Sequence, residues 1–287
     1  MGVAIGACGG GSSSSSTAAQ LLSQTFSANI AKIHSGDLAL TIDAQLKGFK
    51  TLHGQPVELQ LSGPFSESAG HGTEFDFSAT ATVEGSTIPL AVLSTGTALY
   101  LEFGGTYYSL PASVNSALGR SAASQGSTGG SSNVLSKLGI DPLSWLTSPK
   151  IVGTTTVGGV STQHLTAQVD VAGLLGDVGK IASNAPGIGK QAASELSSAN
   201  LQQVASAINS AQVDIYSGAS DHILREFRLA VAFTIPGADQ QTLSGLTGGS
   251  LAIDATISNL NAAETIKPPS SSQPFSDLLG GGGLGSL

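Results

Sequence analysis

Charged side chains are scarce in this sequence, and cysteine is nearly absent. Asp, Glu, Lys and Arg make up 10% of its 287 residues, whereas an average globular protein has about 25%. The one cysteine, Cys8, excludes an internal disulfide and any zinc site that needs several cysteines. The net charge of −8 argues against nucleic acid as a partner, because phosphate recognition needs a basic face.

Long hydrophobic runs are missing as well. No stretch of about 18 apolar residues occurs, so the sequence predicts no membrane-spanning helix. The mean hydropathy is nevertheless +0.20, which is high for a chain without such a run. The apolar residues are therefore expected to fill a core or to line a cavity.

The most informative segment that is present surrounds Cys8. It follows Ile5-Gly6-Ala7 and precedes three glycines and a serine run that ends at Ser16. This pattern resembles the bacterial lipobox, at which a signal peptidase cuts and the cysteine becomes the acylated first residue. A signal peptide has a basic start and a longer apolar stretch, so we expect the true start to lie upstream. Residues 1–16 are then a signal-peptide remnant, the lipidated cysteine and a flexible tether. The other interpretation is a lone cysteine in an unstructured tail.

Periodicity predicts one helix followed by many strands. Leu22, Phe26, Ile30 and Ile33 recur at helical spacing, and Gly36 is a typical stop signal. Beyond it, apolar and polar residues alternate in short stretches between turn residues, as in half-buried antiparallel strands. Such stretches lie at residues 38–47, 57–61, 75–84, 88–92, 99–103, 107–108, 151–157, 160–171, 213–216, 223–235 and 251–257.

Two interior segments and the C-terminus interrupt the strand pattern. Residues 110–148 contain a low-complexity loop and a short helix with Leu143, Trp145 and Leu146 on its apolar side. Residues 172–208 predict two helices broken at a Pro-Gly pair. About eleven antiparallel strands with segregated helices make an α+β layered protein. We expect a single domain over residues 17–269, and a disordered tail rich in Ser, Pro and Gly over residues 270–287.

Motifs of familiar catalytic and metal sites are not found. The sequence has no Gly-x-Ser-x-Gly elbow and no His-Glu-x-x-His pair. Gly187-Ile188-Gly189-Lys190 lacks both the first glycine of a phosphate loop and the Ser or Thr that should follow. Most carboxylates alternate outward on strands, as in solvated faces. We therefore expect no enzymatic activity, no metal site and no cofactor.

The order of the elements carries a resemblance to a known family. The motifs are Cys8 with its tether and the helix before Leu38–Ile42, Ala98–Leu101 with Gly105–Tyr108, Gly158–Leu165 leading to Val169-Asp170, Val213–Tyr216, Asp221–Leu229, and Lys267–Pro269. In this order they resemble the LppX/LprG-type lipoproteins of actinobacteria and, more broadly, the LolA-like half-barrel fold. The likeness spans most of residues 17–269. Residues 184–208 and the Gly-rich tail depart from it.

The resemblance implies a large curved antiparallel sheet, wrapped over helices as a half-barrel, with an apolar cavity for acyl chains. The aromatic candidates are Tyr107, Tyr108 and Trp145, whose apolar rings and polar tips suit a cavity mouth. An ordinary core edge is the other interpretation of these three residues, and Tyr107 and Trp145 are counted among the lining candidates. The other candidates are the inward strand positions Leu40, Ile42, Leu59, Phe75, Phe77, Leu99, Leu101, Leu165, Val169, Phe227, Leu229, Val231 and Ile253. A solid core would need the same residues, so the pattern leaves a cavity and a closed core both open.

The expected function is that of a lipoprotein on the outer face of the cytoplasmic membrane in a bacterial cell envelope. Acyl chains at Cys8 would anchor the protein, and its cavity would bind a lipid or glycolipid and transfer it across the envelope. A transporter is one option for a protein partner. The alternative is an envelope scaffold or sensor with a solid core that binds a protein. A hydrolase would need a buried Ser–His pair, which the scattered His positions disfavour.

Overall fold

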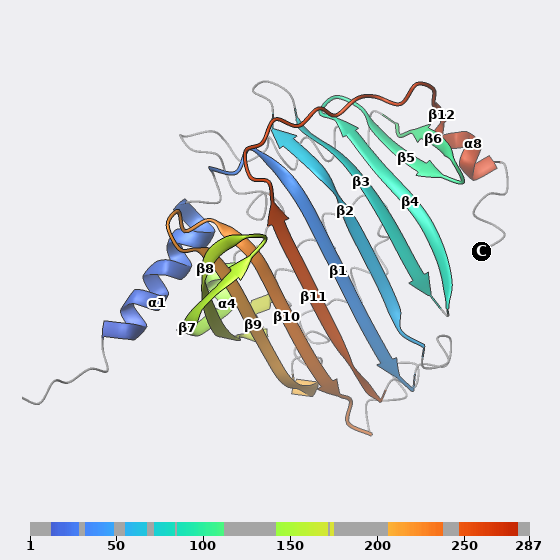
Figure 1. Cartoon of the computed structure of the whole chain (residues 1–287). Helices are drawn as coiled ribbons and strands as arrows, with labels where there is room; N and C mark the ends of the chain where they lie inside the picture. Colours follow the sequence, from blue (N-terminus) through green and yellow to red (C-terminus); the bar gives the residue numbers. More distant parts are fainter. Residues whose placement is uncertain are drawn as a thin grey trace, which may run out of the picture.

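One large antiparallel sheet dominates the computed structural model of the protein (Figure 1). The structure describes residues 13–28, 32–48, 55–67, 72–83, 85–111, 142–171, 173–174, 206–237 and 247–280. Twelve strands form an open sheet in the order β12-β6-β5-β4-β3-β2-β1-β11-β10-β9-β8-β7. The predicted α+β fold with a curved, half-barrel-like antiparallel sheet is confirmed, and the helix content of the described ranges is low.

The sheet consists of two meanders that meet in its middle. The first contains β1 (Ser35–Lys47), β2 (Val57–Glu67), β3 (Thr73–Val83), β4 (Ser86–Thr95), β5 (Leu99–Phe103) and β6 (Thr106–Ser109). The second contains β7 (Leu146–Val157), β8 (Val160–Val169), β9 (Ile208–Gly218), β10 (Leu224–Thr234) and β11 (Gly248–Ser258). β1 and β11 join the meanders in a register that places Leu40 opposite Ala255 and Ile42 opposite Ile253.

Glycine pairs set two of the hairpin turns. Gly104 and Gly105 have φ angles of 59° and 78°, and Gly158 and Gly159 have φ angles of 56° and 81°. Two consecutive residues with positive φ form a type I′ turn, whose twist matches that of the flanking strands. The two-residue turns fix the registers of β5 with β6 and of β7 with β8 at the turn.

Helices lie at both ends of the sheet. α1 (Ser13–Ser23) continues into the π-helical turn η1 (Gln24–Ala28), and α4 (Pro142–Trp145) leads directly into β7. α8 (Phe275–Gly280) contacts β6 and the short strand β12 (Gln273–Pro274) at the opposite end. Within the described ranges, no helix is long and apolar enough to cross a membrane.

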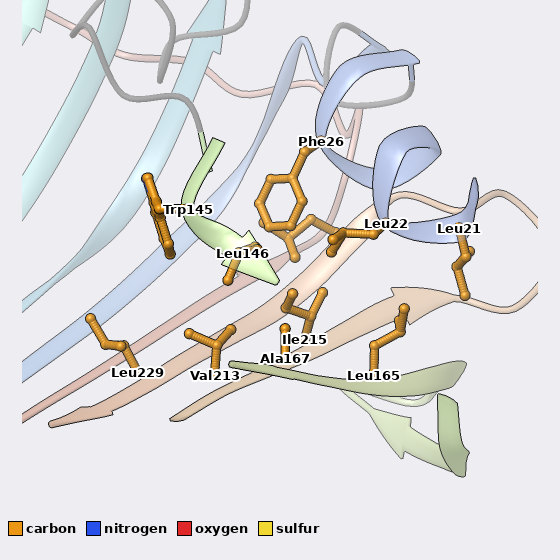
Figure 2. Close-up of a cluster of buried hydrophobic side chains, with 11 residues drawn as sticks. Leu21, Leu22, Phe26, Trp145, Leu146, Leu165, Ala167, Val213, Ile215 and Leu229 are labelled. Atoms are coloured by element: carbon orange, nitrogen blue, oxygen red, sulfur yellow. The ribbon is translucent and has the colours of Figure 1, made fainter. Parts of the chain in front are cut away.

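The densest apolar packing lies where α1, η1 and α4 cover β7 to β10 (Figure 2). This core cluster consists of Leu21, Leu22, Phe26, Trp145, Leu146, Leu165, Ala167, Val213, Ile215, Leu224 and Leu229. Leu165, Val213 and Ile215 are 0% exposed. The ring of Phe26 meets that of Phe227 edge to face, with centroids 6.5 Å apart. α1 is thus held by its apolar face, as the spacing of Leu22 and Phe26 predicted.

Several boundaries differ from the sequence prediction. The predicted first helix includes Ile33 and stops at Gly36, but Ile33 is not helical and β1 already begins at Ser35. α1 begins at Ser13, inside the predicted tether, because a serine run can start a helix without adding any periodic apolar signal. β7 begins at Leu146, which the prediction placed on a helix. The ladder between β7 and β8 shifts register between Thr147 and Lys150, and such an irregularity is where a strand tolerates a residue like Pro149.

The C-terminal segment is a further correction. Disorder was expected from residue 270 onward, but β12 pairs in parallel with Tyr108 and Ser109 of β6, and α8 follows. Leu278 of α8 is 3% exposed. The segment covers the edge of the sheet, and proteins commonly cover an edge strand in this way because its unpaired backbone groups would otherwise attract another chain. Composition alone carries no information about such a contact.

Several sequence predictions lie outside the described residues. These are the lipidation site Cys8, the low-complexity loop within residues 112–141, and most of the helices predicted over residues 172–208.

Candidate functional site

The pairing registers bring the apolar positions of the strands onto a single face of the sheet. Residues directly opposite each other in an antiparallel pair point to the same side. One such row crosses six adjacent strands and contains Leu61, Leu40, Ala255, Phe227, Ile215 and Leu165. The next row contains Leu59, Ile42, Ile253, Leu229, Val213 and Ala167. We call the side with these rows the inner face, since α1 and α4 pack on it.

The strand residues predicted to line a cavity all lie on the inner face. Besides those in the two rows, Phe77, Val92 and Leu101 are successive partners across β3, β4 and β5. Phe75 and Leu99 both pair with Ser94. Val169 and Val231 share the face by strand parity with Leu165 and Leu229.

Tyr107, an aromatic candidate on β6, does not share the inner face. It pairs with Glu102, whereas its neighbour Tyr108 pairs with Leu101 of the inner face. Tyr107 therefore points to the opposite side, the outer face. The Gly104-Gly105 turn already contained this information, because a two-residue turn makes Glu102 and Tyr107 partners.

Burial changes along the inner face. Leu165, Val213 and Ile215 are completely buried under α1, while Phe227, Val231 and Ile253 are only partly buried where they pack against the cluster. Further along, the inner positions Leu38, Leu40, Ile42, Leu59, Leu61, Phe75, Phe77, Val92 and Leu101 are all half-buried. Among the apolar inner positions of this stretch, only Ala79 and Leu99 are buried, each with 8% exposure.

We call this half-buried stretch, on β11 and β1 to β5, the open face. It is an extended apolar surface rather than a scatter of single side chains. Such a surface suits an apolar ligand or an apolar partner.

An aromatic group and a glycine shape the middle of the open face. The rings of Phe75 and Phe77 stack at 4.8 Å with an interplanar angle of 10°. Beside them, Gly63 has a φ of 153°, and a Cβ there would lie 2.0 Å from the backbone oxygen of Asp76. Only glycine allows β2 and β3 to approach this closely.

The outer face carries a polar cluster that the sequence analysis did not identify. His164 Nε2 lies 2.7 Å from Asp214 Oδ1, and the His164 ring stacks on Tyr216 at 4.6 Å. Arg228 lies 5.4 Å from the centre of the Tyr216 ring and donates its Nε–H to Asp254 at 2.9 Å. These residues come from four neighbouring strands. Single-strand alternation shows that each is polar, but it does not show that they meet.

Glu226 is the most deeply buried member of this cluster and also pairs with Arg228. It is 6% exposed. Desolvation raises the pKa of Glu226; the charge of Arg228 opposes this rise and that of Asp254 adds to it. The charged side chains of the cluster pair with one another across β8 to β11, which indicates a structural network.

A small polar pocket of about 390 Å³ lies at the C-terminal edge of the sheet. It is lined by Gly105, Thr106 and Tyr107 of the first meander and by residues 270–273. Burial raises the pKa of Tyr107, and the carboxylates of Asp76 and Glu102 raise it further. Hydroxyl groups and carboxylates around Tyr107 do not suit acyl chains, in agreement with its place outside the apolar face.

Trp145, the other aromatic lining candidate, lies in the core cluster. It ends α4 and is 3% exposed. Figure 2 shows it at the same end of the cluster as Leu229, while Leu21 lies at the other end. Among the residues that the structure describes, no group of His, Cys, Asp and Glu is arranged to hold a metal ion.

Comparison with known proteins gives structural neighbours only. No protein-family model matches the sequence. No curated protein matches it either. LprF from Mycobacterium bovis is similar with a TM-score of 0.45 and 16% identity, over 90% of this chain and 99% of that chain. The lipoprotein LppX from Mycobacterium tuberculosis has a TM-score of 0.41 and 11% identity, over 88% and 99%.

A third neighbour is the MucA/MucB complex from Pseudomonas aeruginosa, with a TM-score of 0.32 and 10% identity, over 87% of this chain and 59% of that chain. The LppX lipoprotein, of the type that the sequence resembles, is thus among the structural neighbours. At these identities and TM-scores the likeness concerns the course of the chain and says nothing of a ligand.

Proposed function

We propose that the protein binds the acyl chains of a lipid or glycolipid along the open face of its sheet. One observation carries this proposal: the inner face is fully buried at Leu165, Val213 and Ile215 under α1 but is only half-buried over β11 and β1 to β5, although the residues there are equally apolar. The part of this Leu, Ile, Val and Phe surface that stays in contact with water is unfavourable in the free protein. Each CH₂ group that leaves water for such a surface contributes about 0.8 kcal/mol, so a dozen contribute on the order of 10 kcal/mol before ordering costs.

The N-terminus suits a membrane anchor for this carrier. Cys8 stands five residues before the start of α1 at Ser13, and five extended residues span at most about 18 Å. Two acyl chains give a stable anchor where one is marginal. We propose that Cys8 is diacylated and holds the protein at the outer face of the cytoplasmic membrane in a bacterial envelope, where the bound lipid is passed to an acceptor.

The proposed mechanism requires binding and release but no bond-making step. The open face supplies apolar contact, and the covered end of the sheet supplies a rigid support for it. The polar cluster of His164 and Asp214 lies on the other side of the sheet and has no part in holding the chains.

Native mass spectrometry of the full chain with Cys8→Ser, purified from an actinobacterial host, tests the lipid carrier. We expect an adduct of lipid mass that extracts into organic solvent. A matched pair of variants places the site: Leu61→Glu puts a charge on the open face, whereas Ser62→Glu puts the same charge on the exposed outer face one residue away. The first should lose the adduct and the second should keep it.

A mass of the unliganded chain alone from that host, together with no uptake of an apolar dye, would refute the proposal that the protein carries a lipid. That result would favour the alternative of an envelope scaffold, with a protein partner bound over the open face. Loss of the adduct in both variants would also count against the open face, because the outer-face charge should not reach the chains.

A further inference from the structure

Trp145 carries a buried hydrogen-bond donor that the described residues do not satisfy. Its side chain is 3% exposed, and its indole Nε1 has no hydrogen-bond partner within the described part of the chain. Leaving a buried donor unpaired is costly, and most such groups in folded proteins find a partner in the protein, in water or in a ligand. An unpaired donor next to a proposed ligand surface therefore points to that ligand.

Two contacts hold the base of this side chain. Trp145 is the last residue of α4, and β7 begins at the next residue. Its backbone oxygen accepts a hydrogen bond from the Asp170 N–H at 2.7 Å. Gly173 packs so closely that a Cβ there would lie 3.1 Å from the Cβ of Trp145. These contacts hold the backbone oxygen and the Cβ of Trp145, which limits where the indole donor can find another partner.

The ring also lies at the boundary between the closed and the open parts of the inner face. Figure 2 shows Trp145 at the same end of the core cluster as Leu229. Leu229 pairs with Ile253 of β11, and Ile253 is only partly buried. A ligand on the open face that reaches the core cluster would meet the indole at this point.

We propose that the indole N–H of Trp145 donates a hydrogen bond to an ester carbonyl oxygen of the bound lipid. This inference rests on the proposed function and adds the place of the linkage between chains and head group. Acyl chains have no acceptor, and the surrounding cluster is apolar, which disfavours a buried free carboxylate. An ester carbonyl is a neutral acceptor that sits directly at the end of an apolar chain, and an ether oxygen in its place is a poorer acceptor.

Because Trp145 is the only tryptophan of the chain, its indole can be changed alone. Replacement of all tryptophan by benzothienylalanine keeps the shape of the ring and removes only the N–H. The test measures binding of a diester phospholipid and of its diether analogue with the same chains, by the Cys8→Ser protein with and without this replacement. Tyr107→Phe, which removes a polar group from the outer face, is the matched control.

We expect the native indole to favour the diester, and its replacement to weaken diester binding about three- to tenfold while diether binding stays unchanged. The emission of Trp145 should shift with the diester only. Without ligand, the replaced protein should be as stable as the original, since no partner is lost. The variant Trp145→Phe is a simpler test of the same point. Its loss of packing would weaken the binding of both lipids equally, whereas its loss of the N–H would weaken the binding of the diester only.

Two results overturn the proposal and leave the lipid carrier standing. One is equal binding of both lipids before and after the replacement. The other is a loss of stability in the ligand-free protein, which would show that a water or the protein already satisfies the donor. If neither lipid binds to the original protein, the proposed function itself fails, and this inference fails with it.

Discussion

Truncating one leucine at each end of a single row of the inner face tests whether the sheet has a closed and an open part. Leu165 and Leu61 lie in the same row of paired residues, five strands apart, and both belong to regular strands. Leu165 is 0% exposed under α1, and Leu61 is half-buried. Each is changed to Ala in the Cys8→Ser protein after removal of lipid.

The expected costs follow from burial. A fully buried Leu→Ala change loses the transfer free energy of its carbons and leaves a cavity, so Leu165→Ala should lower the free energy of unfolding by about 3 kcal/mol. Leu61→Ala loses a smaller contact and leaves no closed cavity, so about 1 kcal/mol is expected. With a urea dependence of about 3 kcal/mol per M, the unfolding midpoints should fall by about 1 M and about 0.3 M.

Bound lipid should distinguish the two variants in a second way. A ligand that binds the native state adds to its stability, and Leu61→Ala should reduce that added stability while Leu165→Ala leaves it in place. Equal costs of the two changes in lipid-free protein would refute the reasoning, because the supposed open face would then be as tightly packed as the core.

Three further outcomes are expected. Gly63→Ala should cost several kcal/mol in thermal unfolding, since its Cβ would lie 2.0 Å from the backbone oxygen of Asp76, whereas Gly85→Ala, with φ +76° and nothing within 4 Å, should cost only about 1 kcal/mol; similar costs would contradict the close approach of β2 and β3. Burial raises the pKa of Glu226 in the folded protein, so its contribution to stability is present at acidic pH and is lost as the pH rises from about 4.5 through the folded pKa; Glu226→Gln should remove this fall from a series of urea titrations, and an unchanged profile would assign it elsewhere. Leu278→Ala should loosen α8 from the edge of the sheet and promote self-association through β6, which light scattering would detect; a strictly monomeric variant with wild-type stability would show that α8 does not protect the edge.

The strands were predictable because alternation is a local property of the sequence. Leu38, Leu40 and Ile42 alternate with polar or small residues whatever lies beside them, and β1 follows that stretch. Glycine pairs marked two of the hairpins for the same local reason, because positive φ at both positions needs no distant contact. Errors arose where no such pattern exists, as in the serine run at the start of α1.

The sequence predicted which residues share a face of the sheet, but it did not predict how deeply each is buried or which polar residues meet. Every strand residue chosen as inward does lie on the inner face, since strand parity decides it. Tyr107 was misplaced although the register of its two-residue turn was readable. The outer-face contact between His164 and Asp214 was not readable, because they are 50 residues apart and meet only through the pairing of β8 with β9.

The sequence by itself determined an antiparallel sheet with one apolar face, a helix before it and a cysteine in a lipobox-like setting. Only the tertiary structure decided how that face is used. The same alternation produces the fully buried Leu165 and the half-buried Leu61, and they differ because α1 covers β7 to β10 while the described helices leave the open face less protected. Burial depends on which elements pack together, and that depends on contacts between residues far apart in the chain, which no local pattern records.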